Sequence, residues 1–271
     1  MKRKVVVGHW KDQAVLKSVD EWSRVALAYA DSQDMRIARF GDNMREVSVT
    51  EGDKVSAQLQ FGYRVDGYGM GDLLAYIDQV TAAQITDLIR AYDEVYRIDK
   101  SLKSKTNFSL IEAARIELGM SAFMQQGGFS AFTTTFENLT GLKQLPGIAV
   151  QQLMAMGYGF GAEGDWKTAA LVRSMKVMSV GLAGGSSFME DYTYHFDDMG
   201  SKVLGAHMLE ICPTISHGFK TIECHPLGIG GKEDPVRIVF DITPGEALNA
   251  CLLYTSPSPR DATLSRMPSS A

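Results

Sequence analysis

The stretch GYGFGAEGDWKTAA, residues 157–170, places three glycines at alternate positions directly before a glutamate, Glu163. Alternating glycines in a strand let another backbone come close and leave room around a neighbouring carboxylate. A helical run, residues 166–178, follows at once, and Asp165 stands where an N-cap residue is expected. A helix N-terminus favours an anionic or oxygen-rich ligand. The stretch therefore predicts either a ligand site at Glu163 or an ordinary tight turn with a solvated acid, and spacing alone leaves both open.

Composition limits the classes of protein to which the chain can belong. Of its 271 residues, 45% are hydrophobic and 22% charged, which is typical of a globular chain with one large domain or two ordinary ones. The net charge is −5 and no basic block occurs, so we expect neither a nucleic-acid partner nor a membrane partner. The apolar run after Met1 is too short for a signal peptide or a membrane span. The cysteines, Cys212, Cys224 and Cys251, lack CxxC spacing, which favours a cytoplasmic location over a disulfide scaffold.

Apolar periodicity predicts that strands and helices alternate as far as residue 181. Short β-branched or alternating runs predict strands, and apolar residues at spacings of three and four predict helices. The glycine-rich residues 65–71 lack the GxGxxG spacing, so we expect no phosphate-binding loop there. The expected strands cover residues 4–8, 35–40, 47–49, 55–63 and 131–136, and the expected helices cover residues 12–29, three runs within 73–124, 148–156 and 166–178.

From about residue 182 the pattern changes to β. On the first run, residues 187–196, alternation would place Glu190, Tyr192 and Tyr194 on one face. After residue 250 the sequence becomes rich in proline and serine, which predicts a disordered tail, and its similarity to a translated sequencing adapter indicates a non-native origin. The further expected strands cover residues 202–212, 221–225 and 236–242.

Three residues could together carry chemistry, namely Glu163, Glu190 and His207. Two carboxylates and an imidazole form a mixed oxygen and nitrogen donor set that suits Mn²⁺ or Mg²⁺ better than a structural zinc. Such an ion can bridge neighbouring substrate oxygens, while a carboxylate of the pair moves a proton between adjacent carbons. The alternatives are an exposed strand acid for Glu190 and a core histidine with one hydrogen bond for His207. Only the fold can bring the three positions together.

Several long stretches of the sequence resemble the L-arabinose isomerase family. They keep the family's order and spacing from about residue 4 to residue 249. The resemblance implies a three-layer α/β central domain of the fucose and arabinose isomerase type, followed by the start of a β-rich domain. The stretches are VVVGHWKD, RIARFGDNMREV, FTTTFENL, KQLPGIAVQQLMAMGYGFG, GYGFGAEGDWKTAA, SFMEDYTYHF, LGAHMLEICP and HPLGIGGKEDPVRIVF.

The resemblance also implies a function. Members of this family are intracellular Mn²⁺-dependent aldose–ketose isomerases that interconvert L-arabinose and L-ribulose through an enediol, and many accept D-galactose. By motif, Glu163 and Glu190 would be both metal ligands and proton-transfer residues, and His207 a third metal ligand. By similar placement, the residues that line the sugar pocket would be Met44, Phe136, Tyr192 and Met208.

The resemblance further implies a longer parent protein that forms hexamers. We expect residues 1–33 to be the remnant of an N-terminal α/β domain, 34–181 the central domain, 182–250 the start of the C-terminal domain and 251–271 a non-native tail. The family's second histidine ligand has no matching motif here. We therefore expect an internal fragment with three of four metal ligands and little or no activity of its own.

Two alternatives belong to other functional classes. A metal-free glycoside hydrolase would use Glu163 and Glu190 as acid and nucleophile, with carboxylates roughly 5–10 Å apart and no role for His207. A non-catalytic sugar-binding module would need neither the metal nor the proton transfer. The response of the melting temperature to EDTA separates the metal-dependent reading from both, because a bound metal stabilises the folded state by mass action.

Overall fold

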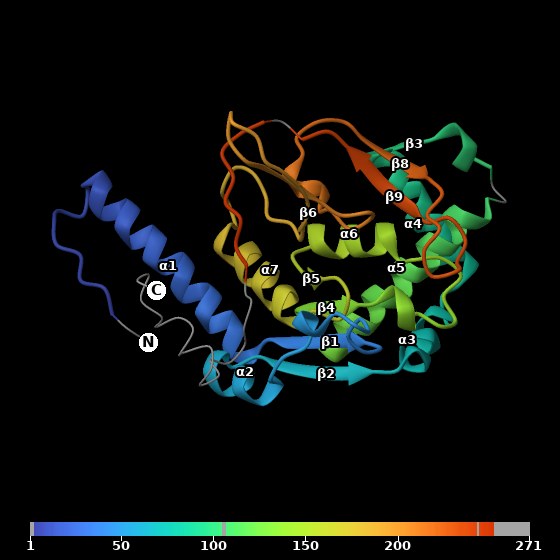
Figure 1. The fold of residues 1–271 in the computed structure, drawn as a ribbon, viewed down its shortest axis with the longest axis horizontal. Helices are drawn as coiled ribbons and strands as arrows, with labels where there is room; N and C mark the ends of the chain where they lie inside the picture. Colours follow the sequence, from blue (N-terminus) through green and yellow to red (C-terminus); the bar gives the residue numbers. More distant parts are fainter. Residues whose placement is uncertain (1–2, 105–106, 243, 252–271) are drawn as a thin grey trace.

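The computed structural model describes residues 3–104, 107–242 and 244–251. A four-stranded parallel sheet lies at its centre, with the strand order β2-β1-β4-β5 (Figure 1). In this sheet Ile37 pairs with Val65 on one side and with Ala131 on the other. The strands are β1 (Arg36–Phe40), β2 (Arg64–Tyr68), β4 (Ala131–Thr134) and β5 (Gly159–Gly161).

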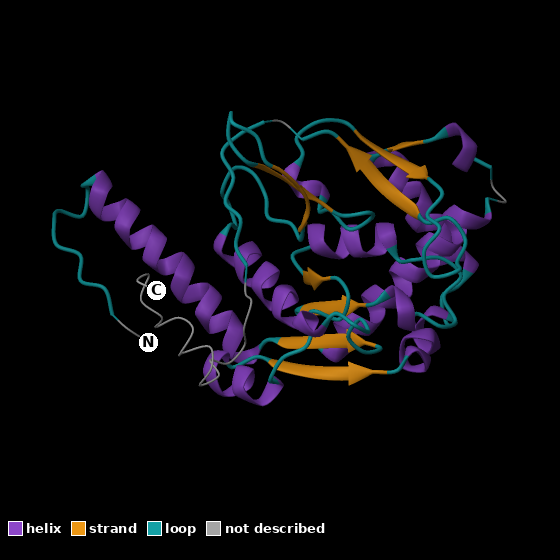
Figure 2. Cartoon of the chain, in the orientation of Figure 1, coloured by secondary structure: helices purple, strands orange, loops and turns teal. Residues whose placement is uncertain are grey.

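Helices cover both faces of this sheet, so the expected three-layer α/β fold is confirmed (Figure 2). Alternation along β1 explains the layers, because successive side chains of a strand point to opposite faces. Ile37 joins the apolar cluster that contains Trp166 of α7, whereas Ala38 and Phe40 join the cluster built from α3, α5 and α6. The helices are α1 (Gln13–Asp34), α3 (Met70–Ile77), α5 (Phe108–Gly127), α6 (Gly147–Ala155) and α7 (Trp166–Met178).

A second sheet joins the region after residue 182 to the central part. Its order is β3-β8-β9, with β3 parallel to β8 and β8 antiparallel to β9. Ile222, Val236 and Ile238 of this sheet pack with residues of α4, α5 and α6. The expected β character is thus present, but one strand of the sheet comes from before residue 100. The elements are β3 (Arg97–Ile98), α4 (Ala82–Val95), β8 (Lys220–Cys224), β9 (Val236–Phe240), and the separate hairpin β6 (Glu190–His195) and β7 (Lys202–Ala206).

Two of the strands expected near the N-terminus are absent. Residues 4–8 form no strand, and Val5 and Val7 are 75% and 88% exposed. Within the described residues these valines have no neighbouring strand to pair with, so their β propensity is unused. Residues 47–49 overlap a single 3₁₀ turn, η1 (Ser48–Thr50), instead.

The strand expected over residues 55–63 is also wrong, because the structure forms helix α2 (Lys54–Phe61) there. The carboxylate of Asp53 accepts a hydrogen bond from the N–H of Ser56 at 2.9 Å and so caps the helix. Gly62 ends it in the left-handed region with φ +89°. These two caps outweigh the alternating pattern, and Leu59 remains 82% exposed on the helix.

The junction between β5 and α7 agrees with its sequence signals. Asp165 caps α7, since its carboxylate accepts from the N–H groups of Lys167 at 3.0 Å and Thr168 at 3.1 Å. A side chain at Gly159 would collide with the carbonyl oxygen of Ala169, and one at Gly161 with that of Asp165. The alternating glycines therefore allow α7 to pack directly against the backbone of β5.

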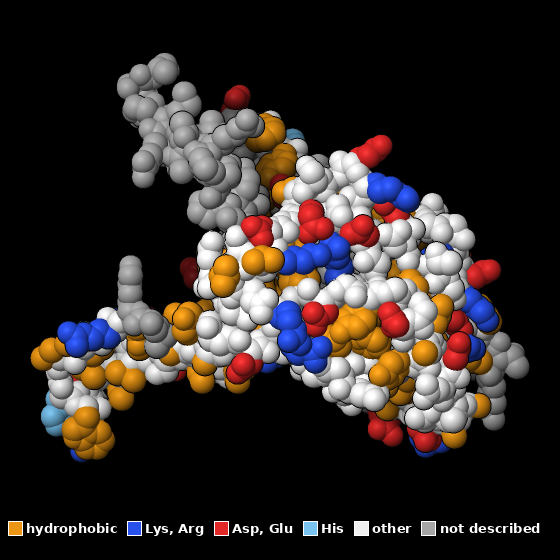
Figure 3. Space-filling model, turned by 90° about the horizontal axis from the view of Figure 1, so that it is seen from below, with side chains coloured by type: hydrophobic (Ala, Val, Ile, Leu, Met, Phe, Trp, Pro, Cys, Tyr) orange, Lys and Arg blue, Asp and Glu red, His pale blue; other side chains and the backbone are white. Residues whose placement is uncertain are grey.

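Helix α1 extends from the body as an arm (Figure 1). Its inner end is held on α7 by the ion pair of Asp31 with Arg173 at 2.6 Å and by Arg24, which donates to the carbonyl of Met178. Figure 3 shows hydrophobic side chains along this arm, and Leu16 and Leu27 are about half exposed or more. Within the described part of the chain, no helix combines the length and the apolar character needed to cross a membrane.

Candidate active site

Glu163 lies in the turn between β5 and α7, at the carboxyl end of the central parallel sheet, where such folds place their ligands. Its φ is +60°, in the left-handed region that non-glycine residues rarely adopt. Hydrogen bonds hold this conformation. The carbonyl of Glu163 accepts from the N–H of Met44 at 2.8 Å, and the N–H of Gly164 donates to the carbonyl of Thr134 at 3.0 Å. The turn is thus fixed between the segment that follows β1 and the last residue of β4, as strained residues in folded proteins usually are.

Glu190 and His207 come from the β6–β7 hairpin. Glu190 begins β6 and pairs with Ala206, so the next residue, His207, emerges beside it. The Nε2 atom of His207 lies 3.8 Å from Oε1 of Glu190. The strand expected over residues 202–212 ends at Ala206, and His207 therefore does not lie on a strand. The chain turns inward there and buries Leu209 and Cys212.

Glu210 belongs to the candidate site, and the sequence did not predict it. Its Oε2 lies 2.6 Å from Nδ1 of His207, and both side chains are 9% exposed. A carboxylate on Nδ1 fixes the imidazole so that Nε2 is presented to a ligand, the usual arrangement around metal-binding histidines. The ring of Phe188 packs edge-on against the imidazole at 5.0 Å between centroids. The His-x-x-Glu spacing was the only available signal, and it is weak without the fold.

The charges of the site act on one another. Burial raises the pKa of Glu163, and the neighbouring charge of Glu190 raises it further. Burial also raises the pKa of Glu190, while His207 opposes this rise. Burial by itself lowers the pKa of His207, but the hydrogen bond to Glu210 and the nearby carboxylates outweigh it, so the pKa is raised. The three predicted residues therefore lie close enough to share one electrostatic environment.

A cavity of about 50 Å³ adjoins these residues, although Glu190 is not among those that line it. Glu163 and His207 line it together with Phe136 and Met208. Met44, which was also expected there, is not among the lining residues, although its N–H donates to the carbonyl of Glu163. Tyr192 is not among the lining residues. A β-bulge between Asp191 and Thr193 breaks the expected alternation of β6, and Tyr192 is 49% exposed.

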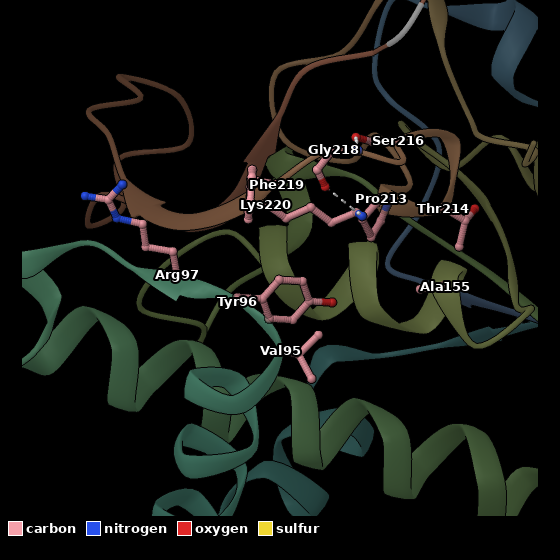
Figure 4. A pocket seen from close by; sticks show the side chains of 10 residues that line it. All are labelled: Val95, Tyr96, Arg97, Ala155, Pro213, Thr214, Ser216, Gly218, Phe219 and Lys220. Atoms are coloured by element: carbon pink, nitrogen blue, oxygen red, sulfur yellow. Dashed lines mark hydrogen bonds between the residues drawn. The ribbon is translucent and has the colours of Figure 1, made fainter.

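A larger cavity, of about 310 Å³, lies elsewhere, between β3, α6 and η4 (Pro213–Ile215). Figure 4 shows its lining, which includes Tyr96, Thr214 and Lys220 but no carboxylate and no imidazole. It lacks an acid–base pair of the kind that proton transfer between carbons requires. The smaller cavity at Glu163 is therefore the better candidate active site.

The residues present fit a divalent cation by the chemistry of their donors. Glu163, Glu190 and His207 offer carboxylate oxygens and an imidazole nitrogen, and Glu210 already orients that imidazole. Among the residues that the structure describes, no three such side chains are already arranged closely enough to hold an ion. The three side chains therefore lie near one another, but they are not spaced as the ligands of a preformed metal centre would be.

Comparison with protein-family models gives a match to the L-arabinose isomerase central domain over residues 36–181. The chain belongs to the L-arabinose isomerase family. The N-terminal and C-terminal domain models of the same family match residues 1–34 and 185–258. These matches give no support to a glycoside hydrolase or to a non-catalytic sugar-binding module. The expected tail from residue 251 falls almost entirely outside the described residues.

Curated relatives agree with this assignment. The chain is 59% identical over 254 residues to an L-arabinose isomerase of Flavobacterium johnsoniae, which covers 93% of this chain and 51% of that protein. It is 59% identical over 253 residues to one of Geobacillus kaustophilus, with the same coverage, and 56% identical over 252 residues to one of Yersinia pestis, covering 92% of this chain and 50% of that protein. The chain thus spans about half the length of the curated relatives it matches.

Proposed function

We propose that the protein is a metal-dependent aldose–ketose isomerase that interconverts L-arabinose and L-ribulose by enediol proton transfer. The observation that carries the proposal is that Glu163 and His207 line one cavity, while Glu190 lies 3.8 Å from the His207 imidazole and Glu210 orients that imidazole. In this proposal the first three residues hold Mn²⁺. Membership of the L-arabinose isomerase family supports the choice of reaction and sugar.

The two glutamates would move the proton. Burial raises the pKa of both, so each can hold a proton closer to neutral pH than a free carboxyl can, which general acid–base catalysis requires. A bound Mn²⁺ supplies polarisation of the sugar oxygens. Phe136 and Met208 would pack against the carbon face of the sugar and exclude water from the intermediate.

The cavity must enlarge to admit a sugar. Its volume of about 50 Å³ is well below the roughly 300–1,000 Å³ of typical small-molecule sites. Leu227 and Ile229 form one wall of the cavity and belong to the loop between β8 and β9. We expect this loop to move outward when the sugar binds, since other walls include Thr134 of the central sheet and Pro146, which directly precedes α6.

The remaining properties implied by the resemblance form part of the same proposal. They are a role in arabinose breakdown, D-galactose as a second sugar, assembly into hexamers, a cytoplasmic location, and the absence of nucleic-acid and membrane partners. The net charge of −5 is compatible with the absence of nucleic-acid and membrane partners, and the free cysteines in the described residues are compatible with a cytoplasmic location.

Calorimetric titration with MnCl₂ tests the metal site on the 271-residue chain. We expect weak Mn²⁺ binding that falls at least about tenfold in Glu163→Gln and in His207→Ala, because each removes one of few ligands. His225→Ala is the matched control. That histidine also lies 2.6 Å from a glutamate, Glu223, but it is half exposed and does not line the cavity, so its loss should leave binding unchanged.

One outcome would count against the proposed metal site, and a second would count against the expected low activity. Mn²⁺ binding that survives both Glu163→Gln and His207→Ala would show that these residues do not form the site. Conversion of L-arabinose to L-ribulose should be low for this chain alone, because the family's second histidine ligand has no matching motif in it. Robust L-ribulose formation would refute that expectation while supporting the assigned reaction.

A further inference from the structure

Lys176 and Cys212 form a buried pair that the proposed reaction does not use. Lys176 lies in the second half of α7 and is 9% exposed, and Cys212 is fully buried just before η4. The Nζ atom of Lys176 donates to Sγ of Cys212 at 3.4 Å and to the carbonyl of Ser186 at 2.9 Å. A lysine amine is rarely buried against a thiol, since an ammonium is normally paired with oxygen acceptors when it leaves water.

The surroundings hold the thiol in place. The N–H of Cys212 donates to Oγ of Ser187 at 2.8 Å, and Sγ lies 3.1 Å from Oγ1 of Thr214. Oγ of Ser186 is buried and has no hydrogen-bond partner in the described part of the chain. Sulfur, amine and hydroxyl groups thus meet in a small buried space that can accommodate polar atoms.

A small oxidant has a route to this pair. Thr214, which contacts the sulfur, also lines the 310 Å³ cavity shown in Figure 4. Thr214 is therefore shared by the cavity, which can hold hydrogen peroxide, and by the surroundings of the thiol. On the other side, residues 181–185 form an exposed loop that leads to Ser186.

We propose that Lys176 and Cys212 are the two ends of a reversible covalent crosslink in which an oxygen atom joins Nζ to Sγ. Hydrogen peroxide is the oxidant, and two molecules are consumed. The first oxidises the thiol to a sulfenic acid and leaves as water, with cleavage of its O–O bond. The second oxidises the deprotonated amine to a hydroxylamine and also leaves as water.

The hydroxylamine oxygen then attacks the sulfur. An S–O bond forms, the S–OH bond breaks, and the departing hydroxide takes the hydroxylamine O–H proton to become a third water. Sulfur and nitrogen each lose two electrons, and the peroxide oxygens gain four. Four thiol groups of a reductant such as dithiothreitol return these electrons and regenerate the lysine, the cysteine and one water.

The crosslink would join two parts of the candidate active site. Lys176 belongs to α7, the helix that follows the Glu163 turn, and Cys212 ends the segment that carries His207 and Glu210. Oxidation would therefore fasten that segment to α7, and reduction would release it.

Peptide mass spectrometry on the chain treated with hydrogen peroxide tests the proposal directly. Trypsin cleaves the untreated chain after Lys176, Lys202 and Lys220, and Cys212 lies in the peptide that ends at Lys220. In the crosslinked chain we expect one species in which residues 174–202, uncut at Lys176, are joined to residues 203–220. Its mass should exceed the sum of the two peptides by one oxygen minus two hydrogens, and dithiothreitol should abolish it.

Internal and matched controls sharpen the result. Met199 is 91% exposed, so its sulfoxide reports that enough oxidant was present, and dithiothreitol does not reverse it. Cys212→Ser and Lys176→Arg should each remove the linked species, whereas Cys224→Ser should retain it. Two results on the unsubstituted chain would overturn the proposal. One is oxidised Met199 without linked peptides, and the other is a sulfinic acid on Cys212 together with an unmodified Lys176.

Discussion

Lys167 offers the sharpest test of how the active-site turn is supported. Its side chain is 1% exposed at the start of α7. Nζ donates to the carbonyls of Val49 at 2.7 Å and Glu51 at 2.8 Å, and it lies 3.2 Å from the carboxylate of Asp165. The buried amine therefore ties the segment after β1 to the helix that follows Glu163. Lys167→Met keeps most of the side-chain volume and removes only the charge and its hydrogen bonds.

The magnitude follows from these partners. Removing one member of a buried ion pair costs about 3–5 kcal/mol, because the other polar groups stay buried without a partner. Asp165 keeps its hydrogen bonds to the first turn of α7, so we expect the lower end, about 3 kcal/mol. For a slope of about 2 kcal/mol per molar urea, the urea midpoint should fall by about 1.5 M.

Urea unfolding followed by tryptophan fluorescence measures this change, since Trp166 is fully buried next to Lys167. The matched control is Lys103→Met. Lys103 pairs with Asp93 at 3.1 Å, but both side chains are more than half exposed, and such pairs contribute about 0–1 kcal/mol. Equal midpoint shifts for Lys103→Met and Lys167→Met would refute the role assigned to the buried amine.

Three further predictions concern stability. Burial raises the pKa of Glu117 from its ordinary value of 4.5 to about 8, so its contribution to the free energy of unfolding is fully present below pH 4.5 and is lost as the pH rises through 8. Glu117→Gln, which can still accept from Tyr92, should flatten the fall of the urea midpoint over that pH range. At about 1.4 kcal/mol per pKa unit, the free energy of unfolding of the unchanged protein falls by at most about 5 kcal/mol. A pH profile that Glu117→Gln leaves unchanged would contradict the role of Glu117. Gly161→Ala should destabilise by about 1–3 kcal/mol because its Cβ meets the carbonyl of Asp165, whereas Gly67→Ala, which meets nothing within 4 Å, should be neutral or slightly stabilising by thermal melting. Asp165→Ala should lower the melting temperature by the loss of a helix N-cap, about 1 kcal/mol, and of the ion pair with Lys167; a loss smaller than that of Lys167→Met alone would contradict the shared network.

Local signals were enough for some elements and misleading for others. Helix α7 begins at Trp166, where the sequence places it, because its cap at Asp165 is encoded by adjacent residues. Residues 55–63 alternate like a strand, yet Asp53 and Gly62 cap a helix there. Both kinds of signal were present in the sequence, and the capping hydrogen bonds prevailed. The 3.6-residue periodicities within 73–124 likewise predicted α3, α4 and α5, whose apolar stripes face buried clusters.

The site divides in the same way. Sequence alone identified Glu163, Glu190 and His207 as donors, and the tertiary structure brings them together. The sequence did not identify Glu210, which contacts His207 only because the chain turns inward after Ala206. Nor did it foresee the β-bulge that leaves Tyr192 outside the cavity. Bulges and turns of this kind depend on the partner strand, which is remote in sequence.

The sequence by its own residues set the helix caps, the glycine contacts of β5 and the chemical identity of the donors, since each depends on neighbours a few positions away. The tertiary structure alone decided that these donors meet, that Glu210 orients His207, and that Lys176 faces Cys212. Burial and the sum of nearby charges set the pKa of Glu163 and Glu190. Both quantities arise where remote segments pack together, and no local pattern of residues encodes them.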